Sequence, residues 1–179
     1  GWFDKRWMYE ESFKMPFVIR NPRTIKAGTT SDAMVMNVDF APTLLDMAGL
    51  EIPSEMQGKS FKGAFNGNEK NQRKSVYYHY YEYPLWHKVQ PHYGVKTDRY
   101  KLMHFYYSMD EWELYDLKTD PNEMNNIYSE VSVELIESLK KELNELRNEY
   151  KDDGSIEQMR RMTDTVIERV YKEPHKIKK

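Results

Sequence analysis

The chain has 179 residues, 27 basic and 29 acidic side chains, a formal net charge of -2 and no cysteine. This length allows one domain or slightly more, and the balanced charge gives no long-range field for a polyanion, so we expect no nucleic-acid partner. Disulfides and thiolate metal sites are excluded, and no apolar run approaches the roughly 20 residues of a membrane span, so we expect no membrane partner and can assign no compartment.

Residues 1–65 have the pattern of pieces of an α/β layer. Trp7–Phe13 is predicted to be a short helix, and Phe17–Arg20 has the short apolar pattern of a buried strand. Asp39 is predicted to be the N-cap of a helix that starts at Phe40 and stops at Gly49, because its apolar residues recur at helical spacing.

Residues 66–73 are predicted to connect this layer to a second subdomain, residues 74–153, since glycine and asparagine accumulate there. β-branched and aromatic residues then concentrate in four segments, which predicts a four-stranded antiparallel sheet with a tight hairpin at Thr97–Arg99. The four predicted strands are Ser75–Tyr83, His92–Thr97, Tyr100–Tyr107 and Trp112–Leu117.

A helix is predicted to cover this sheet. Apolar residues from Ile136 to Tyr150 alternate steps of three and four, which makes one apolar stripe. Residues 154–179 form a charged tail whose weak period indicates a further helix.

Several motifs resemble one protein family in order from residue 1 to about residue 150. The run Asp4-Lys5-Arg6-Trp7-Met8-Tyr9-Glu10 with Lys14-x-Pro16 resembles the anion-binding segment of formylglycine-dependent (type I) sulfatases, nearest their N-acetylglucosamine-6-sulfatase-like branch in the alkaline-phosphatase superfamily. Further matching segments are Asn37–Gly49, Gln57–Ser60, His92–Leu102 and Glu113–Asn126. Each segment alone is a weak signal, whereas their common order makes coincidence improbable.

The resemblance implies that the chain is the C-terminal part of such an enzyme. The fold class would be α/β, the C-terminal part of an alkaline-phosphatase-like sulfatase fold, with residues 1–65 belonging to the large catalytic domain and the small antiparallel sheet packed against a C-terminal helix. The complete enzyme would hydrolyse a sulfate ester of a sulfated sugar, such as a 6-sulfated N-acetylglucosamine of a glycosaminoglycan or mucin-type glycan. Its partners would be that carbohydrate and the missing N-terminal catalytic region.

The cofactors follow from the same resemblance. A chain without cysteine has no precursor of formylglycine, so the nucleophile would lie upstream and this chain alone would be inactive. Ca²⁺ would be held by upstream carboxylate and amide oxygens. We assign no metal ligand to this chain, since the spacing of its histidines fits no familiar zinc signature.

Lys5 is the candidate catalytic residue. Fixed cations around a sulfate ester stabilise the charge that its oxygens gain when the S–O bond breaks, and the resemblance gives this role to Lys5. Arg6, in the same charged triplet, is a candidate substrate-binding residue. The alternative is that both are solvent-facing charges before a helix.

His87 and His92 are further candidate substrate-binding residues, because they flank an aromatic, Pro-marked loop in which tyrosines and imidazoles could contact a pyranose ring. The alternative is a strand with alternating core and surface side chains, which we expect for His79. Two other functions stay open, a phosphomonoesterase or phosphonate hydrolase of the same superfamily and a stand-alone carbohydrate-binding module.

Overall fold

The computed structural model describes residues 5–67, 73–84 and 88–172. The chain forms two compact units, one comprising Gly1–Met15 with Tyr77–Lys179 and the other comprising Pro16–Val76. The described residues 5–15 therefore belong to the unit that contains the sheet, whereas the sequence-based division grouped them with residues 16–65. None of the helices in the described ranges is both long and apolar enough to cross a membrane.

The larger unit is built on a four-stranded sheet in the order β1 (Ser75–His79), β2 (His92–Thr97), β3 (Tyr100–Phe105), β4 (Glu111–Asp116). β2 pairs antiparallel with β3, and β3 pairs antiparallel with β4. Between β2 and β3 the Thr97 hydroxyl accepts hydrogen bonds from the backbone N–H groups of Arg99 and Tyr100, at 3.3 and 2.9 Å, which closes the predicted hairpin. The predicted sheet is confirmed, with β1 shorter than expected.

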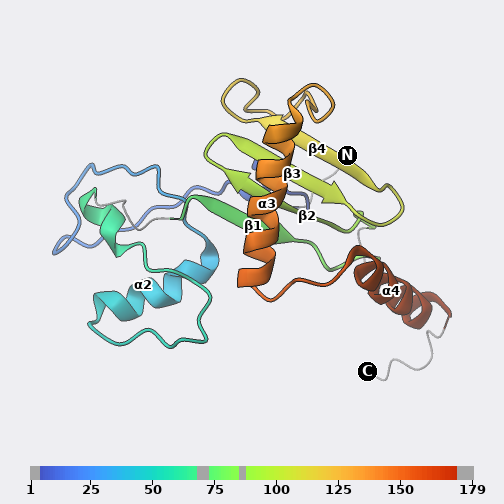
Figure 1. The fold of residues 1–179 in the computed structure, drawn as a ribbon. Coiled ribbons are helices and arrows are strands. Elements are labelled where there is room, and N and C mark those ends of the chain that lie inside the picture. Colours follow the sequence, from blue (N-terminus) through green and yellow to red (C-terminus); the bar gives the residue numbers. More distant parts are fainter. Residues whose placement is uncertain (1–4, 68–72, 85–87, 173–179) are drawn as a thin grey trace. The chain divides into compact units, whose positions relative to one another are not determined.

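Helix α3 (Val133–Glu149) crosses one face of this sheet (Figure 1). Its N-cap is Ser132, whose hydroxyl accepts a hydrogen bond from Leu135 N. Leu139, Leu143 and Leu146 pack against residues that point to the same side of the strands, as the period of two in a strand requires. The buried members on the strands and just after β3 are Tyr93, Val95, Leu102, Tyr106 and Leu114.

Helix α4 (Ile156–Ile167) follows α3 and confirms the helix indicated in the charged tail. Ser155 and Gln158 form a reciprocal capping box at its start. Met159 and Thr163 are buried, and Met159 joins the core under α3. One π-helical turn, Glu168–Lys172, ends the described part of the chain.

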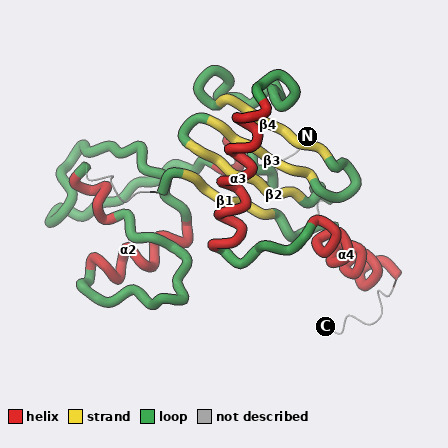
Figure 2. Tube along the Cα trace, in the orientation of Figure 1, coloured by secondary structure: helices red, strands yellow, loops and turns green. Residues whose placement is uncertain are grey.

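In its described residues, the smaller unit contains α2 (Phe40–Met47), two short 3-10 turns at Asn37–Asp39 and Lys62–Asn66, and the first two residues of β1, and is otherwise loop (Figure 2). Asp39 precedes α2 as predicted, but its carboxylate does not cap that helix. Instead the carboxylate is buried and binds Met36 N, Lys59 N and the Arg73 guanidinium. A buried carboxylate is stabilised most by a cation and several hydrogen-bond donors, so the Asp39 carboxylate binds these groups and does not cap α2.

Phe17–Arg20 is not a strand in this structure, so that prediction was wrong. Strand geometry persists only where backbone N–H and C=O groups have a partner, and none of the described residues pairs with this segment as a β-ladder. Val18 is 91% exposed. The Phe17 ring stacks on Phe40 at 5.0 Å, so the segment is held by ring packing instead.

Candidate functional site

The segment Lys5–Phe13, which contains helix α1 (Glu10–Phe13), packs on the face of the sheet opposite α3. Met8 is completely buried against Met103 and Tyr115. A Cβ added at Gly94 would lie 2.7 Å from Met8 Sδ and 2.4 Å from the Leu102 carbonyl oxygen. Glycine at position 94 therefore makes room for the methionine that holds this segment on the sheet.

Trp7 is the second anchor of the segment. Its ring stacks on His92 with a centroid distance of 5.6 Å and lies 5.7 Å from the Phe105 ring. These partners belong to β2 and β3, so the residue directly after Lys5 and Arg6 in sequence rests on the middle of the sheet.

Tyr9 and Glu10 supply polar anchors. The Tyr9 hydroxyl donates to the Glu113 carboxylate at 2.8 Å, and burial together with that carboxylate raises the pKa of Tyr9. The Glu10 carboxylate binds Lys96 Nζ at 2.8 Å and Lys101 Nζ at 2.7 Å. Every residue from Trp7 to Glu10 thus contacts the sheet.

The ion pairs of Glu10 belong to a buried network. Lys101 is fully buried in β3 and also lies 2.6 Å from the Glu123 carboxylate, which in turn accepts a hydrogen bond from Glu10 N at 2.6 Å. Burial raises the pKa of Glu10, but hydrogen bonds and charges from Lys101 and Lys96 outweigh it and leave the pKa lowered. Because two carboxylates face two lysines, the network is charge-balanced and ties α1 to the sheet.

Arg6 and Lys5 lie at the start of this anchored segment. The Arg6 guanidinium forms an ion pair with Glu82, and the Arg6 carbonyl accepts a hydrogen bond from the Tyr78 hydroxyl at 2.9 Å. Lys5 is exposed, and Arg6 is about one-quarter exposed. Two successive cationic residues therefore stand at the start of a segment that contacts with the sheet hold in place.

His92 is placed differently from its predicted setting beside a loop. It is fully buried in β2, between Trp7, Tyr80 and Phe105. Its Nδ1 donates to the Gln90 carbonyl at 2.8 Å, so Nε2 carries the free lone pair. Nε2 is buried and has no hydrogen-bond partner among the described residues. Burial lowers the pKa of His92 to about 4, so the ring is neutral near pH 7.

The predicted sugar contact by His92 stays a prediction, and it requires that a ligand reach Nε2 past the covering rings. His87, the other predicted sugar contact, lies outside the described residues. Of the predicted site residues, Lys5, Arg6 and His92 lie in the described part of the chain. Trp7 links them, because it follows Arg6 in sequence and stacks on His92.

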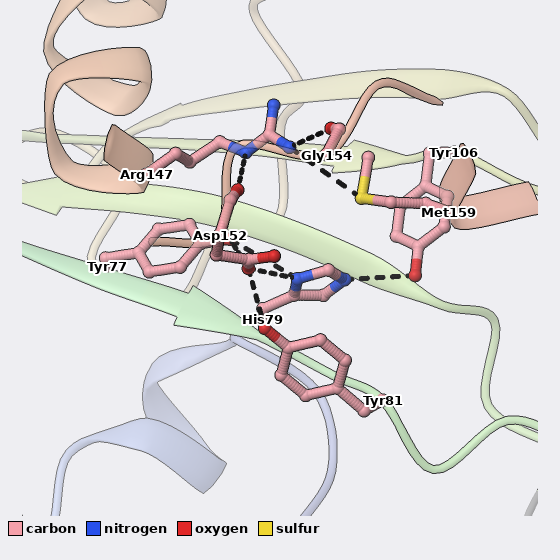
Figure 3. Close-up of polar contacts among 8 residues, drawn as sticks. All are labelled: Tyr77, His79, Tyr81, Tyr106, Arg147, Asp152, Gly154 and Met159. Carbon is pink, nitrogen blue, oxygen red and sulfur yellow. Dashed lines mark hydrogen bonds and ion pairs between the residues drawn. The ribbon is translucent and has the colours of Figure 1, made fainter. Parts of the chain in front are cut away.

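A second polar cluster lies where β1 meets the connection between α3 and α4 (Figure 3). The Asp152 carboxylate accepts hydrogen bonds from Tyr77, from Tyr81 at 2.6 Å and from His79 Nδ1 at 2.6 Å. His79 Nε2 accepts from the Tyr106 hydroxyl at 3.0 Å. Both ring nitrogens of His79 are thus used and its side chain is almost fully buried, which agrees with the structural role expected for it.

Arg147 completes this Asp152 cluster from α3. Its guanidinium donates to the backbone carbonyls of Asp152 and Gly154, the first at 3.0 Å (Figure 3). The guanidinium also lies over the Tyr93 ring. Burial raises the pKa of Asp152, but the hydrogen bonds from Tyr77, Tyr81 and His79 outweigh it and lower that pKa. The cluster fastens the chain between the two helices to the edge of the sheet.

In the described part of the chain, no group of three His, Cys, Asp or Glu side chains is arranged to hold a metal ion. The carboxylates of Glu10 and Glu123 lie close to each other, but Lys101 occupies the position between them. These residues do not fit a calcium site.

Sequence reasoning missed the residues that support the site, above all Glu82, Glu113 and Lys101. Glu82 is 76 residues from Arg6 in sequence and Glu113 is 104 residues from Tyr9. One signal was present, since Tyr78, Tyr80 and Glu82 occur at every second position and an extended chain places them on one face.

Comparisons with known proteins agree with this architecture. Residues 1–149 match the family described as N-sulphoglucosamine sulphohydrolase, C-terminal. The chain is 58% identical over 120 residues to an N-acetylglucosamine-6-O-sulfatase of Bacteroides thetaiotaomicron, which covers 65% of this chain and 22% of that protein. It is 44% identical over 68 residues to an N-acetylglucosamine-6-sulfatase of Bos taurus, which covers 35% of this chain and 12% of that protein.

Among solved structures, one in complex with its substrate D-glucosamine-2-N,6-O-disulfate superposes with a TM-score of 0.83 at 51% identity. The superposition covers 88% of this chain and 33% of that one, so the chain spans about a third or less of the proteins it matches. The expected fold class and family resemblance are confirmed. The chain belongs to the family of N-sulphoglucosamine sulphohydrolase C-terminal regions.

Proposed function

We propose that the complete protein containing this chain is a sulfatase that hydrolyses the 6-sulfate ester of a glucosamine or N-acetylglucosamine unit. Two relatives carry the name of such an enzyme, and the structural neighbour binds a 6-O-sulfated glucosamine. The sulfated carbohydrate is then the substrate, and the remainder of the protein supplies the catalytic domain.

The observation that supports this proposal most is the packing of the segment after Lys5 against the sheet. Lys5 is exposed, while Trp7, Met8, Tyr9 and Glu10 are fixed to the sheet by ring stacking, burial and charged hydrogen bonds. A cation held in place by a rigid support stabilises the charge of a sulfate group with little reorganisation. We assign to Lys5 the binding of a sulfate oxygen.

Arg6 is proposed to bind the sugar, since its planar guanidinium suits hydroxyl and anionic oxygens beside the sulfate. His87 is proposed as a second sugar contact. For His92, stacking of its ring on Trp7 supports an indirect role. In this role His92 supports Trp7, and Trp7 positions the preceding residues Lys5 and Arg6.

The cofactors are proposed from the family resemblance. Formylglycine would provide the nucleophile and Ca²⁺ would neutralise sulfate oxygens, both held by residues outside this chain. Within the chain, Lys5 binds the sulfate group and Arg6 orients the sugar of the substrate.

The test is the activity of the complete protein on 6-sulfated N-acetylglucosamine, with the 6-phosphate ester of the same sugar as comparison. We expect sulfate release and, for Lys5→Ala, a fall in kcat of about 100-fold or more, as for loss of one charged transition-state contact. Lys26→Ala, which removes an exposed lysine of the other unit, is the matched control and should leave kcat unchanged.

Release of phosphate without release of sulfate would replace this proposal by a phosphomonoesterase. Sugar binding without hydrolysis of either ester would replace it by a carbohydrate-binding protein. Arg6→Ala and His87→Ala should each raise KM for the sulfated sugar while leaving kinetics on 4-nitrophenyl sulfate unchanged, since that ester has no sugar.

A further inference from the structure

Glu82 contacts the side chain of Arg6. Its carboxylate pairs with the Arg6 guanidinium and also accepts a hydrogen bond from the Tyr80 hydroxyl at 3.4 Å. The Tyr78 hydroxyl holds the Arg6 carbonyl at 2.9 Å. Arg6 is therefore held at its backbone and at the tip of its side chain by one stretch of the sheet edge.

The spacing of Tyr78, Tyr80 and Glu82 explains how one stretch of chain contacts both the backbone and the side chain of Arg6. Tyr78 is the second-to-last residue of β1. Tyr80 N donates to the His92 carbonyl at 2.9 Å, so pairing with β2 continues past the last residue of β1. In an extended chain Tyr78, Tyr80 and Glu82 point to the same face. Tyr80 is buried, and its hydroxyl donates to the Glu82 carboxylate, so a fixed residue contacts that carboxylate.

The energetics favour a role in orientation over a role in stability. The Arg6 and Glu82 side chains are 28% and 31% exposed, and ion pairs at such positions contribute little to the free energy of folding. An arginine side chain, however, loses rotamer entropy when it is immobilised, and a pair formed before binding removes part of that loss from the binding step.

We propose that Glu82 is a positioning residue that orients the Arg6 guanidinium for the sugar of the substrate. The inference rests on the proposed function, in which Arg6 contacts the sugar. Glu82 touches no reacting atom, and its effect passes through Arg6.

The test uses the complete enzyme with Glu82→Gln, a change that keeps the shape of the side chain and removes its charge. KM for 6-sulfated N-acetylglucosamine should rise about fivefold to tenfold with kcat within about twofold, and kinetics on 4-nitrophenyl sulfate should not change. Arg6→Ala should raise KM at least as much, and adding Glu82→Gln to it should cause no further rise, because the two residues act as one unit. Glu111→Gln, at an exposed position on β4, is the matched control.

The outcomes separate the two proposals. If the wild-type enzyme releases no sulfate from the sugar, the proposed function fails. If sulfate is released and Arg6→Ala raises KM while Glu82→Gln does not, the positioning role is overturned and the proposed function stands. Equal losses on the sugar and on 4-nitrophenyl sulfate, additive losses in the double variant, or an Arg6→Ala variant with unchanged KM would also overturn it.

Discussion

Single residues decide how closely the Lys5 segment approaches the sheet. Gly94 is such a residue, because any Cβ there would collide with backbone as well as with Met8. The end of a flexible side chain can move away from an added Cβ, but the backbone of a paired strand cannot. Relief of this clash would therefore cost substantial free energy.

Gly94→Ala should therefore lower the free energy of unfolding by about 2 kcal/mol or more, measured by urea unfolding of the complete protein. Gly154→Ala is the control, since a Cβ there would meet only Gln158 and Met159 at 3.8 and 3.9 Å. Equal stability of the two variants would show that Met8 does not pack on Gly94.

His92 gives the molecule a dependence on acid. Its pKa is lowered by burial from 6.5 to about 4, so between these values the unfolded chain binds a proton that the folded chain does not. Stability conferred by the neutral ring is complete above about pH 6.5 and is lost as the pH falls toward about 4, in total about 3 kcal/mol at about 1.4 kcal/mol per pKa unit.

His92→Asn should weaken the fall in melting temperature between pH 7 and pH 5, because asparagine can donate to the Gln90 carbonyl but does not titrate. The comparison is the change with pH within each protein, since loss of the ring lowers stability at every pH. An unaltered pH dependence would indicate that His92 is not buried in the neutral form.

At the scale of elements, α3 is held by one apolar stripe. Leu139 is 4% exposed and lies on the strand residues of the core, whereas Asn144 on the same helix is exposed. The stripe was readable from sequence because helical spacing is local, and the cap at Ser132 is local too.

Leu139→Ala should lower the free energy of unfolding by about 2 to 5 kcal/mol through lost burial and the cavity left behind. Asn144→Ala should change it by less than about 0.5 kcal/mol. Denaturant unfolding of both variants checks this, and a matching small effect at Leu139 would place the stripe outside the core. KM for the substrate should stay the same, since α3 lies on the face opposite the Lys5 segment.

At the scale of the molecule, the smaller unit leaves large apolar side chains exposed. Leu44 on α2 is 62% exposed, Leu50 is 60% exposed and Val18 is 91% exposed. We expect another part of a longer protein to cover this surface, since the chain matches only a third or less of its longer relatives.

Leu44→Lys should therefore have opposite effects in two settings. In the isolated chain, Leu44→Lys should raise the highest concentration at which the chain remains monomeric, measured by light scattering. In the complete protein, the same change should lower the melting temperature. Glu51→Lys, at an exposed position of the same unit, is the control. Equal tolerance of both changes in the complete protein would mean that Leu44 stays exposed there.

The sequence by itself determined the family, the sheet with its hairpin and helices α3 and α4. These features depend on motif order and on periods of two and 3.6 residues, which are properties of neighbours along the chain. The same local reasoning gave an incorrect strand at Phe17–Arg20, because a strand needs a partner that no local pattern can supply.

Only the tertiary structure decided what holds Lys5 and Arg6. Residues from Arg6 to Glu10 contact partners 76 or more positions away in sequence. Arg6 pairs with Glu82, Trp7 stacks on His92, and Glu10 binds Lys101 and Glu123. An imidazole or a carboxylate has the same local pattern whether it faces solvent or lies beneath a tryptophan. Its burial, and with it its charge and its use to a substrate, depends on which segment folds over it.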